Sequence, residues 1–230
     1  MVLGKSTLIK QIGKLLKPTI GKVSVRGKVG IVFQNPEKGL FEQTVYKDIA
    51  FGPRNVSKED VKEQIEKAIE FVGIPERILR MSPFEISGGE ERKVAIAGTI
   101  AMEPEILILD EPTSGLDPVS RKEILDNIKR YQNENRIIIT ISHDINILAE
   151  YADKILVLDE GRIAMYENTE EMFLKTEELE RLEIELPEIT KIFCELKKRG
   201  VDVNANIYTL EQAKQEILRH VNVEAEVRSE

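Results

Sequence analysis

Two carboxylates follow directly after an apolar run, at a position where a buried strand would end. The run Ile106–Leu109 leads into Asp110-Glu111-Pro112. In α/β folds the end of a strand delivers side chains to the edge of the sheet where ligands collect. We interpret Asp110 as the carboxylate on the Mg²⁺ side of a phosphoryl-transfer site and Glu111 as the base that orients and polarises the attacking water. Taken alone, the pair is more simply explained as two solvated acids.

A second set of polar residues opens the first expected helix, at residues 4–16. Gly4-Lys5-Ser6-Thr7 resembles the second half of the P-loop pattern G-x-x-x-x-G-K-[ST]. Backbone N–H groups at a helix N-terminus point at phosphate oxygens and carry the positive end of the helix dipole. Lys5 would reach the β- and γ-phosphates of ATP, Ser6 would ligate Mg²⁺, and Thr7 would support the phosphate cradle. Because the first glycine of the pattern would precede Met1, we expect a truncated or misassigned start within this loop.

A polar-glycine motif, Ser87-Gly88-Gly89-Glu90, heads a helix expected at 90–102. Its glycines let backbone approach phosphate closely, and a helix start favours an anion. Ser114-Gly115-Leu116-Asp117 follows Asp110 and Glu111 at short range. One such motif is common by chance, but this ordered series is not. The series resembles the signature, Walker B and D-loop motifs of ATP-binding cassette (ABC) ATPases.

The resemblance assigns further roles. In this family two chains hold ATP between them, so Ser87–Glu90 would complete the site of the opposite subunit and Asp117 would lie at the same seam. Gln34 resembles the Q-loop glutamine that contacts Mg²⁺ and water. His143 resembles the switch histidine that contacts the γ-phosphate and holds Glu111 in place, although a single histidine is usually structural. Glu90 stands where the family more often has Gln.

Within the family, the chain is similar to the energy-coupling factor ATPases of vitamin and metal-ion importers. The similarity rests on residues 32–37, 43–45 and 48–53 and on the tail at 186–190 and 196–200. It implies ATP and Mg²⁺ as ligands, a second ATPase subunit, an integral membrane T component and a substrate-binding S component. The chain would lie on the cytoplasmic face of the membrane. Segment 36–53 would belong to the coupling surface, with Phe41, Val45 and Phe51 as contacts, but ordinary packing explains these three residues equally well.

Apolar strands that alternate with amphipathic helices predict a parallel α/β sheet covered on both faces, here a P-loop NTPase (RecA-like) core. The Glu160-Gly161 pair predicts a hairpin turn, and Ser57 and Asp60 suggest the capped start of a helix near residue 61. The expected strands are 23–25, 29–33, 106–109, 136–141, 154–159 and 162–166. The expected helices, besides 4–16 and 90–102, are 61–72, 118–131 and 144–151.

The C-terminal part reads as a small helical appendage. Residues 168–185, rich in Glu and Lys, favour a solvated helical face or connector. A helix should start after Pro187 and stop at Gly200, and Thr209 with Gln212 predicts a capping box for a last helix near 210–220. We therefore predict an ABC nucleotide-binding domain at 1–166 (core 1–43 and 99–166, helical subdomain about 44–98) and a dimerisation appendage at 167–230. By the same resemblance, we expect the N-terminal β subdomain of the family to be missing.

The composition excludes some classes of protein. The 230 residues carry a net charge of −8, which argues against a nucleic-acid partner and so against a cassette ATPase of DNA repair or translation. The apolar runs are shorter than the roughly 20 residues of a membrane span. Two functions remain open: an ATP-hydrolysing importer subunit, and a partner-binding or scaffold protein, or inactive truncated ABC ATPase, without useful turnover.

Overall fold

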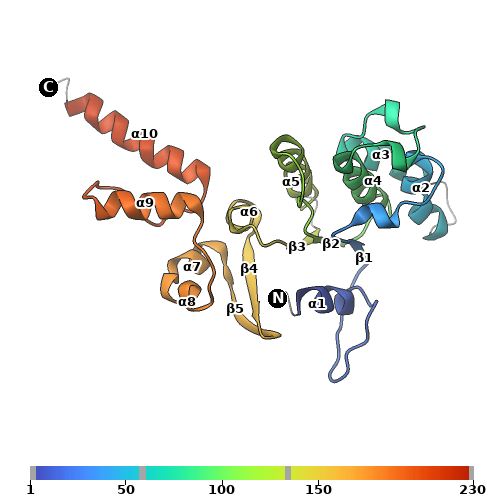
Figure 1. Cartoon of the computed structure of the whole chain (residues 1–230), viewed down its shortest axis with the longest axis horizontal. Coiled ribbons are helices and arrows are strands. Elements are labelled where there is room, and N and C mark those ends of the chain that lie inside the picture. Colours follow the sequence, from blue (N-terminus) through green and yellow to red (C-terminus); the bar gives the residue numbers. More distant parts are fainter. Residues whose placement is uncertain (1–3, 57–60, 133–135, 228–230) are drawn as a thin grey trace. The chain divides into compact units, whose positions relative to one another are not determined.

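The computed structural model describes residues 4–56, 61–132 and 136–227, which belong to two compact units (Figure 1). One unit is Lys5–Ile141, and the other combines Met1–Gly4 with Ser142–Glu230. The predicted division into residues 1–166 and 167–230 stays a prediction.

In the first unit the helices are α1 (Lys5–Ile12), α2 (Val45–Val56), α3 (Lys62–Val72), α4 (Gly88–Ile100) and α5 (Pro118–Gln132), and the strands are β1 (Val29–Val32), β2 (Ile106–Asp110) and β3 (Ile137–Ile141). Short 3₁₀ helices lie at Pro36–Gly39, Glu76–Ile78 and Pro83–Glu85. The second unit contains α6 (Ile145–Tyr151), β4 (Lys154–Asp159), β5 (Arg162–Asn168), α7 (Thr169–Leu174), α8 (Thr176–Arg181), α9 (Glu188–Lys198) and α10 (Leu210–Val227).

The first unit is built on a parallel sheet of order β1-β2-β3, as the alternation of strands and helices predicts. Its central strand β2 is buried from Ile106 to Leu109, which explains the continuous apolar run. Ile9 of α1 packs with Ile106 and Ile108 on one face of the sheet. Strand β1 contacts α4, and β3 contacts α5. The fold is the α/β fold of P-loop NTPases.

Helices α2, α3 and α4 pack against one another, and α4 also reaches the sheet. Helix α2 falls in the predicted helical subdomain at about 44–98, although no individual helix was predicted at 45–56. It forms because Val45, Ile49 and Pro53 recur at helical spacing and are buried. Helix α3 ends at Gly73, whose φ of 72° is the left-handed conformation of a helix C-cap. The expected caps Ser57 and Asp60 lie outside the described residues.

The N-terminal region differs from the expectation in two ways. Helix α1 ends at Ile12, earlier than predicted, and Lys14 then adopts a φ of 58°. Residues 22–26, which the structure describes, form no strand, so the prediction of a strand at 23–25 is wrong. Glycines with positive φ, Gly21 and Gly27, flank this segment and turn the chain on both sides. Two alternating valines are too short a pattern to specify pairing.

In the second unit β4 and β5 form the expected antiparallel hairpin. Its turn residues Glu160 and Gly161 have φ of 45° and 76°, and positive φ at both central positions is typical of a type I′ turn. The expectation of a solvated connector at 168–185 is wrong in part, because α7 and α8 place Phe173 and Leu179 in the core of this unit. The Glu-rich faces of these helices are exposed, as the alternative expectation of a solvated helical face requires, and so is Leu174 at the end of α7.

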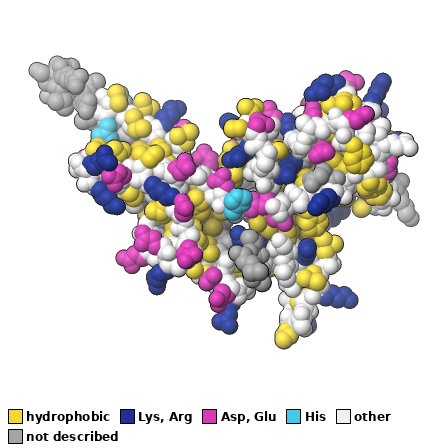
Figure 2. All heavy atoms as spheres, viewed as in Figure 1, with side chains coloured by type: hydrophobic (Ala, Val, Ile, Leu, Met, Phe, Trp, Pro, Cys, Tyr) yellow, Lys and Arg dark blue, Asp and Glu magenta, His cyan; other side chains and the backbone are white. Residues whose placement is uncertain are grey.

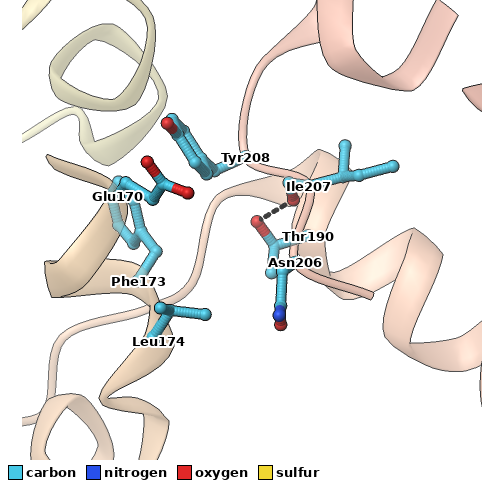
Figure 3. Close-up of a pocket in the computed structure, with 7 residues that line it drawn as sticks. All are labelled: Glu170, Phe173, Leu174, Thr190, Asn206, Ile207 and Tyr208. Atoms are coloured by element: carbon cyan, nitrogen blue, oxygen red, sulfur yellow. Dashed lines mark hydrogen bonds between the residues drawn. The ribbon is translucent and has the colours of Figure 1, made fainter. Parts of the chain in front are cut away.

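The C-terminal helices close a small core of their own around Phe193 and Ile207. The Thr190 hydroxyl on α9 donates to the Ile207 carbonyl at 2.6 Å (Figure 3). The pocket beside this bond has a volume of about 10 Å³, room for no more than one water. The capping box is confirmed, because the Gln212 N–H donates to the Thr209 hydroxyl and the Thr209 N–H to the Gln212 side chain, both at 3.2 Å. Among the described residues, no helix has the length and apolar character that crossing a membrane requires.

Candidate active site

Three residues that the sequence assigns to Mg²⁺ line one open groove in the first unit. Ser6 comes from α1, Gln34 from the segment after β1, and Asp110 from the end of β2. Strands β1 and β2 are parallel neighbours, with Val32 beside Leu109, so their carboxyl ends deliver Gln34 and Asp110 to the same edge. The groove has a volume of about 620 Å³. The structure thus brings these three residues to one groove, and their role in binding Mg²⁺ stays a prediction.

The position of Asp110 at the end of a buried strand affects the pKa of its carboxyl. Burial raises the pKa of the Asp110 carboxyl, and the neighbouring Glu111 raises it further, whereas Lys10 and Lys5 on α1 act to lower it. Lys10 also lines the groove, although the sequence reasoning did not single it out. The sequence could have predicted this, because Lys10 lies four residues after Ser6 and therefore on the same face of the expected helix.

The donor set of the groove fits Mg²⁺. A hydroxyl from Ser6, an amide oxygen from Gln34 and a carboxylate from Asp110 are hard oxygen donors. Mg²⁺ is usually held by one or two carboxylates together with substrate phosphates and water. Lys5 and Lys10 add positive charge close to the same carboxylate, as a site for a polyanionic ligand requires.

Glu111 is held in an unusual backbone conformation. Its φ is 51°, in the left-handed region that residues other than glycine rarely adopt. Its N–H donates to the Ile141 carbonyl of β3 at 2.9 Å, and its own carbonyl accepts from Arg92 Nη1 at 2.8 Å. Such strained residues persist only where the surroundings fix them, and they cluster at functional sites.

The polar-glycine motif forms a capping box at the start of α4, which begins at Gly88. The Ser87 hydroxyl accepts from the Glu90 N–H at 3.3 Å, and the Glu90 carboxylate accepts from the Ser87 N–H at 3.0 Å. Glu90 also pairs with Arg77 at 2.8 Å, and the bond from the Ser87 N–H lowers its pKa most. The S-x-x-E spacing could have predicted this local role. Ser87 and Gly88 are exposed, so the helix start faces solvent.

Asp117 is exposed and caps α5. Its carboxylate accepts from the N–H groups of Val119 at 3.0 Å and Ser120 at 3.1 Å, and bonding with Ser120 lowers its pKa. A Cβ added to Gly89 would lie 3.6 Å from the Ser120 hydroxyl. The start of α5 and the start of α4 are therefore neighbours in this unit.

Lys5, Thr7 and Glu111 belong to the same unit but are not among the residues that line the groove. Thr7 is exposed on α1. Gly4, with a φ of 116°, and His143 belong to the other unit and are described only within it. His143 is exposed and precedes α6, where the Asp144 carboxylate caps the helix by accepting from the Asn146 N–H at 3.0 Å. The roles of Gly4, Thr7 and His143 stay predictions.

Comparison with known proteins identifies the family of the chain. Residues 3–114 match the ABC transporter family. The chain is 47% identical over 236 residues to an energy-coupling factor transporter ATP-binding protein EcfA2 of Caldanaerobacter subterraneus, covering 95% of this chain and 82% of the relative. The Bacillus subtilis protein of the same name is 44% identical, with 93% and 85% covered.

Solved structures lead to the same class. CbiO1 from Clostridium perfringens, part of an ABC transporter complex, has a TM-score of 0.67 at 35% identity, covering 77% of this chain and 78% of that chain. A dimeric ATP-binding cassette in a post-hydrolysis state with ADP and Pi has a TM-score of 0.62 at 26% identity, covering 72% and 80%. The fold and the ordered motifs define an ABC-type ATPase. The chain belongs to the family of energy-coupling factor transporter ATP-binding proteins.

Proposed function

We propose that this chain is the ATP-binding subunit of an energy-coupling factor importer and couples ATP hydrolysis to the uptake of a vitamin or a metal ion. The observation that carries the proposal is the gathering of Ser6, Gln34 and Asp110 around one groove, with the strained Glu111 next in the chain. The high identity to the relatives named above supports it over their whole matched length.

Each site residue has a chemical task in this proposal. Gly4, Lys5 and Thr7 bind the phosphates at the start of α1, and Ser6, Gln34 and Asp110 hold Mg²⁺. Bound Mg²⁺ would neutralise charge on the phosphate oxygens. The Glu111 carboxylate orients the attacking water and accepts its proton, while His143 steadies the γ-phosphate side of the site. The assignments of Ser6, Gln34 and Asp110 rest on the motifs and on the groove, and the other assignments rest on the motifs alone.

A second ATPase subunit would complete the site. Ser87, Gly88, Gly89 and Glu90 would bind the nucleotide of that partner, and Asp117 would lie at the seam. Two observations support this: the N-terminus of α4 is exposed, and the start of α5 adjoins it. One of the similar structures is a dimer of an ATP-binding cassette with ADP and Pi bound.

The appendage would enlarge the interface between the subunits. Figure 2 shows hydrophobic side chains over α9 and α10. Leu210, Ile217, Leu218 and Val221 on α10 are all exposed. Rows of this kind on a helix are typical of surfaces that pack against another chain.

The membrane T component, which holds the substrate-binding S component, would dock beside the groove at the cytoplasmic face. Phe41 and Phe51 line the groove and are 59% and 44% exposed, with ring centroids 4.8 Å apart. Asp48 fixes this surface, because its carboxylate accepts from the Phe41 N–H at 3.1 Å. Val45, the third expected contact, is fully buried in the core of the helical layer, so the prediction that it contributes to this surface is wrong.

ATP turnover of the assembled complex tests the proposal. The chain is co-expressed with its membrane partners, and the purified complex is assayed with Mg²⁺ and ATP. We expect Glu111→Gln to reduce kcat by about 100-fold or more while ATP binding persists. His143→Ala should also reduce kcat. A complex without turnover, or one in which Glu111→Gln changes nothing, would favour the scaffold function instead.

A further inference from the structure

One buried arginine connects the two segments that carry Gln34 and Glu111. Arg92 lies on α4 and is only 8% exposed. Its Nη1 donates to the Glu111 carbonyl at 2.8 Å, and its Nη2 donates to the Gln34 carbonyl at 3.1 Å. A guanidinium is planar and always charged, so it offers two donors at a fixed spacing to two acceptors.

The bond to Glu111 matters because that residue is strained. A φ of 51° is retained only if the neighbouring backbone is held on both sides. The Ile141 carbonyl binds its N–H, and Arg92 binds its carbonyl. A lysine at this position would present one nitrogen as a point charge and could not reproduce the two-armed contact.

We propose that Arg92 is a positioning residue for ATP hydrolysis: its guanidinium fixes Glu111 and Gln34 at one spacing and ties both to helix α4. The proposal rests on the roles of Glu111 and Gln34 proposed above. Arg92 acts through their backbone carbonyls and does not itself contact the nucleotide. Helix α4 also begins at the Ser87–Glu90 motif, so the motif and the two loops are held to one rigid element.

The neighbouring lysine provides a matched control. Lys93 lies on the same helix with a side chain that is 15% exposed, and its ammonium pairs with Glu123 of α5 at 2.6 Å. Lys93→Met therefore removes an equally placed cation from α4 without removing the bonds to Gln34 and Glu111. Arg92→Lys and Arg92→Met are the test variants, and the unfolding midpoint of each variant reports whether it folds.

Two measurements on the full complex decide the proposal. The first compares kcat with the Kd for ATP. We expect Arg92→Met to lower kcat by about 10- to 100-fold, the loss of one or two charged hydrogen bonds, while the Kd for ATP changes by less than about threefold. Arg92→Lys should recover little, and Lys93→Met should leave kcat unchanged.

The second measurement is hydrogen–deuterium exchange without nucleotide. The peptide that contains Gln34 and the peptide that contains Glu111 should both exchange faster in the two Arg92 variants. Their exchange should be unchanged in Lys93→Met. Exchange equal to wild type in the folded Arg92 variants, or a kcat loss shared by Lys93→Met, would overturn the positioning role. If the wild-type complex itself does not hydrolyse ATP, the proposed function fails, and the exchange data alone still decide whether Arg92 holds the two loops.

Discussion

Replacing Glu111 with glycine should make the protein more stable and inactive at once. The left-handed conformation at a φ of 51° costs a residue other than glycine about 1–2 kcal/mol. Glycine removes this strain but loses about 0.5–1 kcal/mol through the greater freedom of the unfolded chain. Because both backbone bonds of residue 111 survive the change, we expect Glu111→Gly to raise the free energy of unfolding by about 0.5–1 kcal/mol. Glu111→Gln keeps the strain and should leave it unchanged.

Urea unfolding and ATP turnover, measured on the same preparations, check this prediction. Glu160→Gly is the matched control, because Glu160 has a φ of 45° in the β4–β5 turn of the other unit. It should gain similar stability and keep its turnover. A fall of the free energy of unfolding in Glu111→Gly, or full turnover by that variant, would refute the link between strain and catalysis at residue 111.

Three further predictions concern the groove and the start of α4. Burial raises the pKa of Asp110 in the folded state, so the ionised carboxylate opposes folding, and the free energy of unfolding of the wild type should rise as pH falls from 7 through that raised pKa. Asp110→Asn should be more stable than the wild type at neutral pH and should lack this part of the pH dependence. Urea unfolding between pH 4 and 8 checks this, because the two stability curves should differ in shape. Asp48→Ala should speed hydrogen exchange at the Phe41 amide and reduce co-purification of the membrane component, because the N–H loses its acceptor; unchanged exchange would contradict the anchoring role. Ser87→Ala should lower the free energy of unfolding, measured by thermal unfolding, by about 0.5–2 kcal/mol, because the helix cap is lost. Glu90→Gln can still accept from the Ser87 N–H and should lower it by less than about 1 kcal/mol. Equal losses in the two variants would contradict the capping role of Ser87.

The sequence predicted the sheet and its polar edge well. A four-residue apolar run such as Ile106–Leu109 suits a strand buried on both faces, and two acids directly after it must lie at the end of that strand. Parallel neighbours then bring Gln34 to the same edge. Because these are consequences of chain direction and burial, motif order was sufficient to predict them.

Other features depended on packing that a sequence does not display. Gly52 and Pro53 have low helix propensity, yet burial of Ile49 and its neighbours outweighs this local preference and α2 forms. Val23 and Val25 alternate as in a strand, but the described residues 22–26 do not pair with another strand. The role of Arg92 depends on two loops that are 58 and 19 residues distant in the chain. Spacing on one helix cannot indicate such a contact.

Isothermal titration of ATP into the purified complex, with and without Mg²⁺, tests the central claim most directly. The claim is that Ser6 and Asp110, brought to one groove by α1 and β2, bind the magnesium–nucleotide complex. We expect the Kd for ATP to rise at least about tenfold when Mg²⁺ is omitted, the equivalent of about 1.4 kcal/mol, and to rise similarly in Ser6→Ala and Asp110→Asn with Mg²⁺ present. Equal affinity in wild type and both variants, with no dependence on Mg²⁺, would contradict the account.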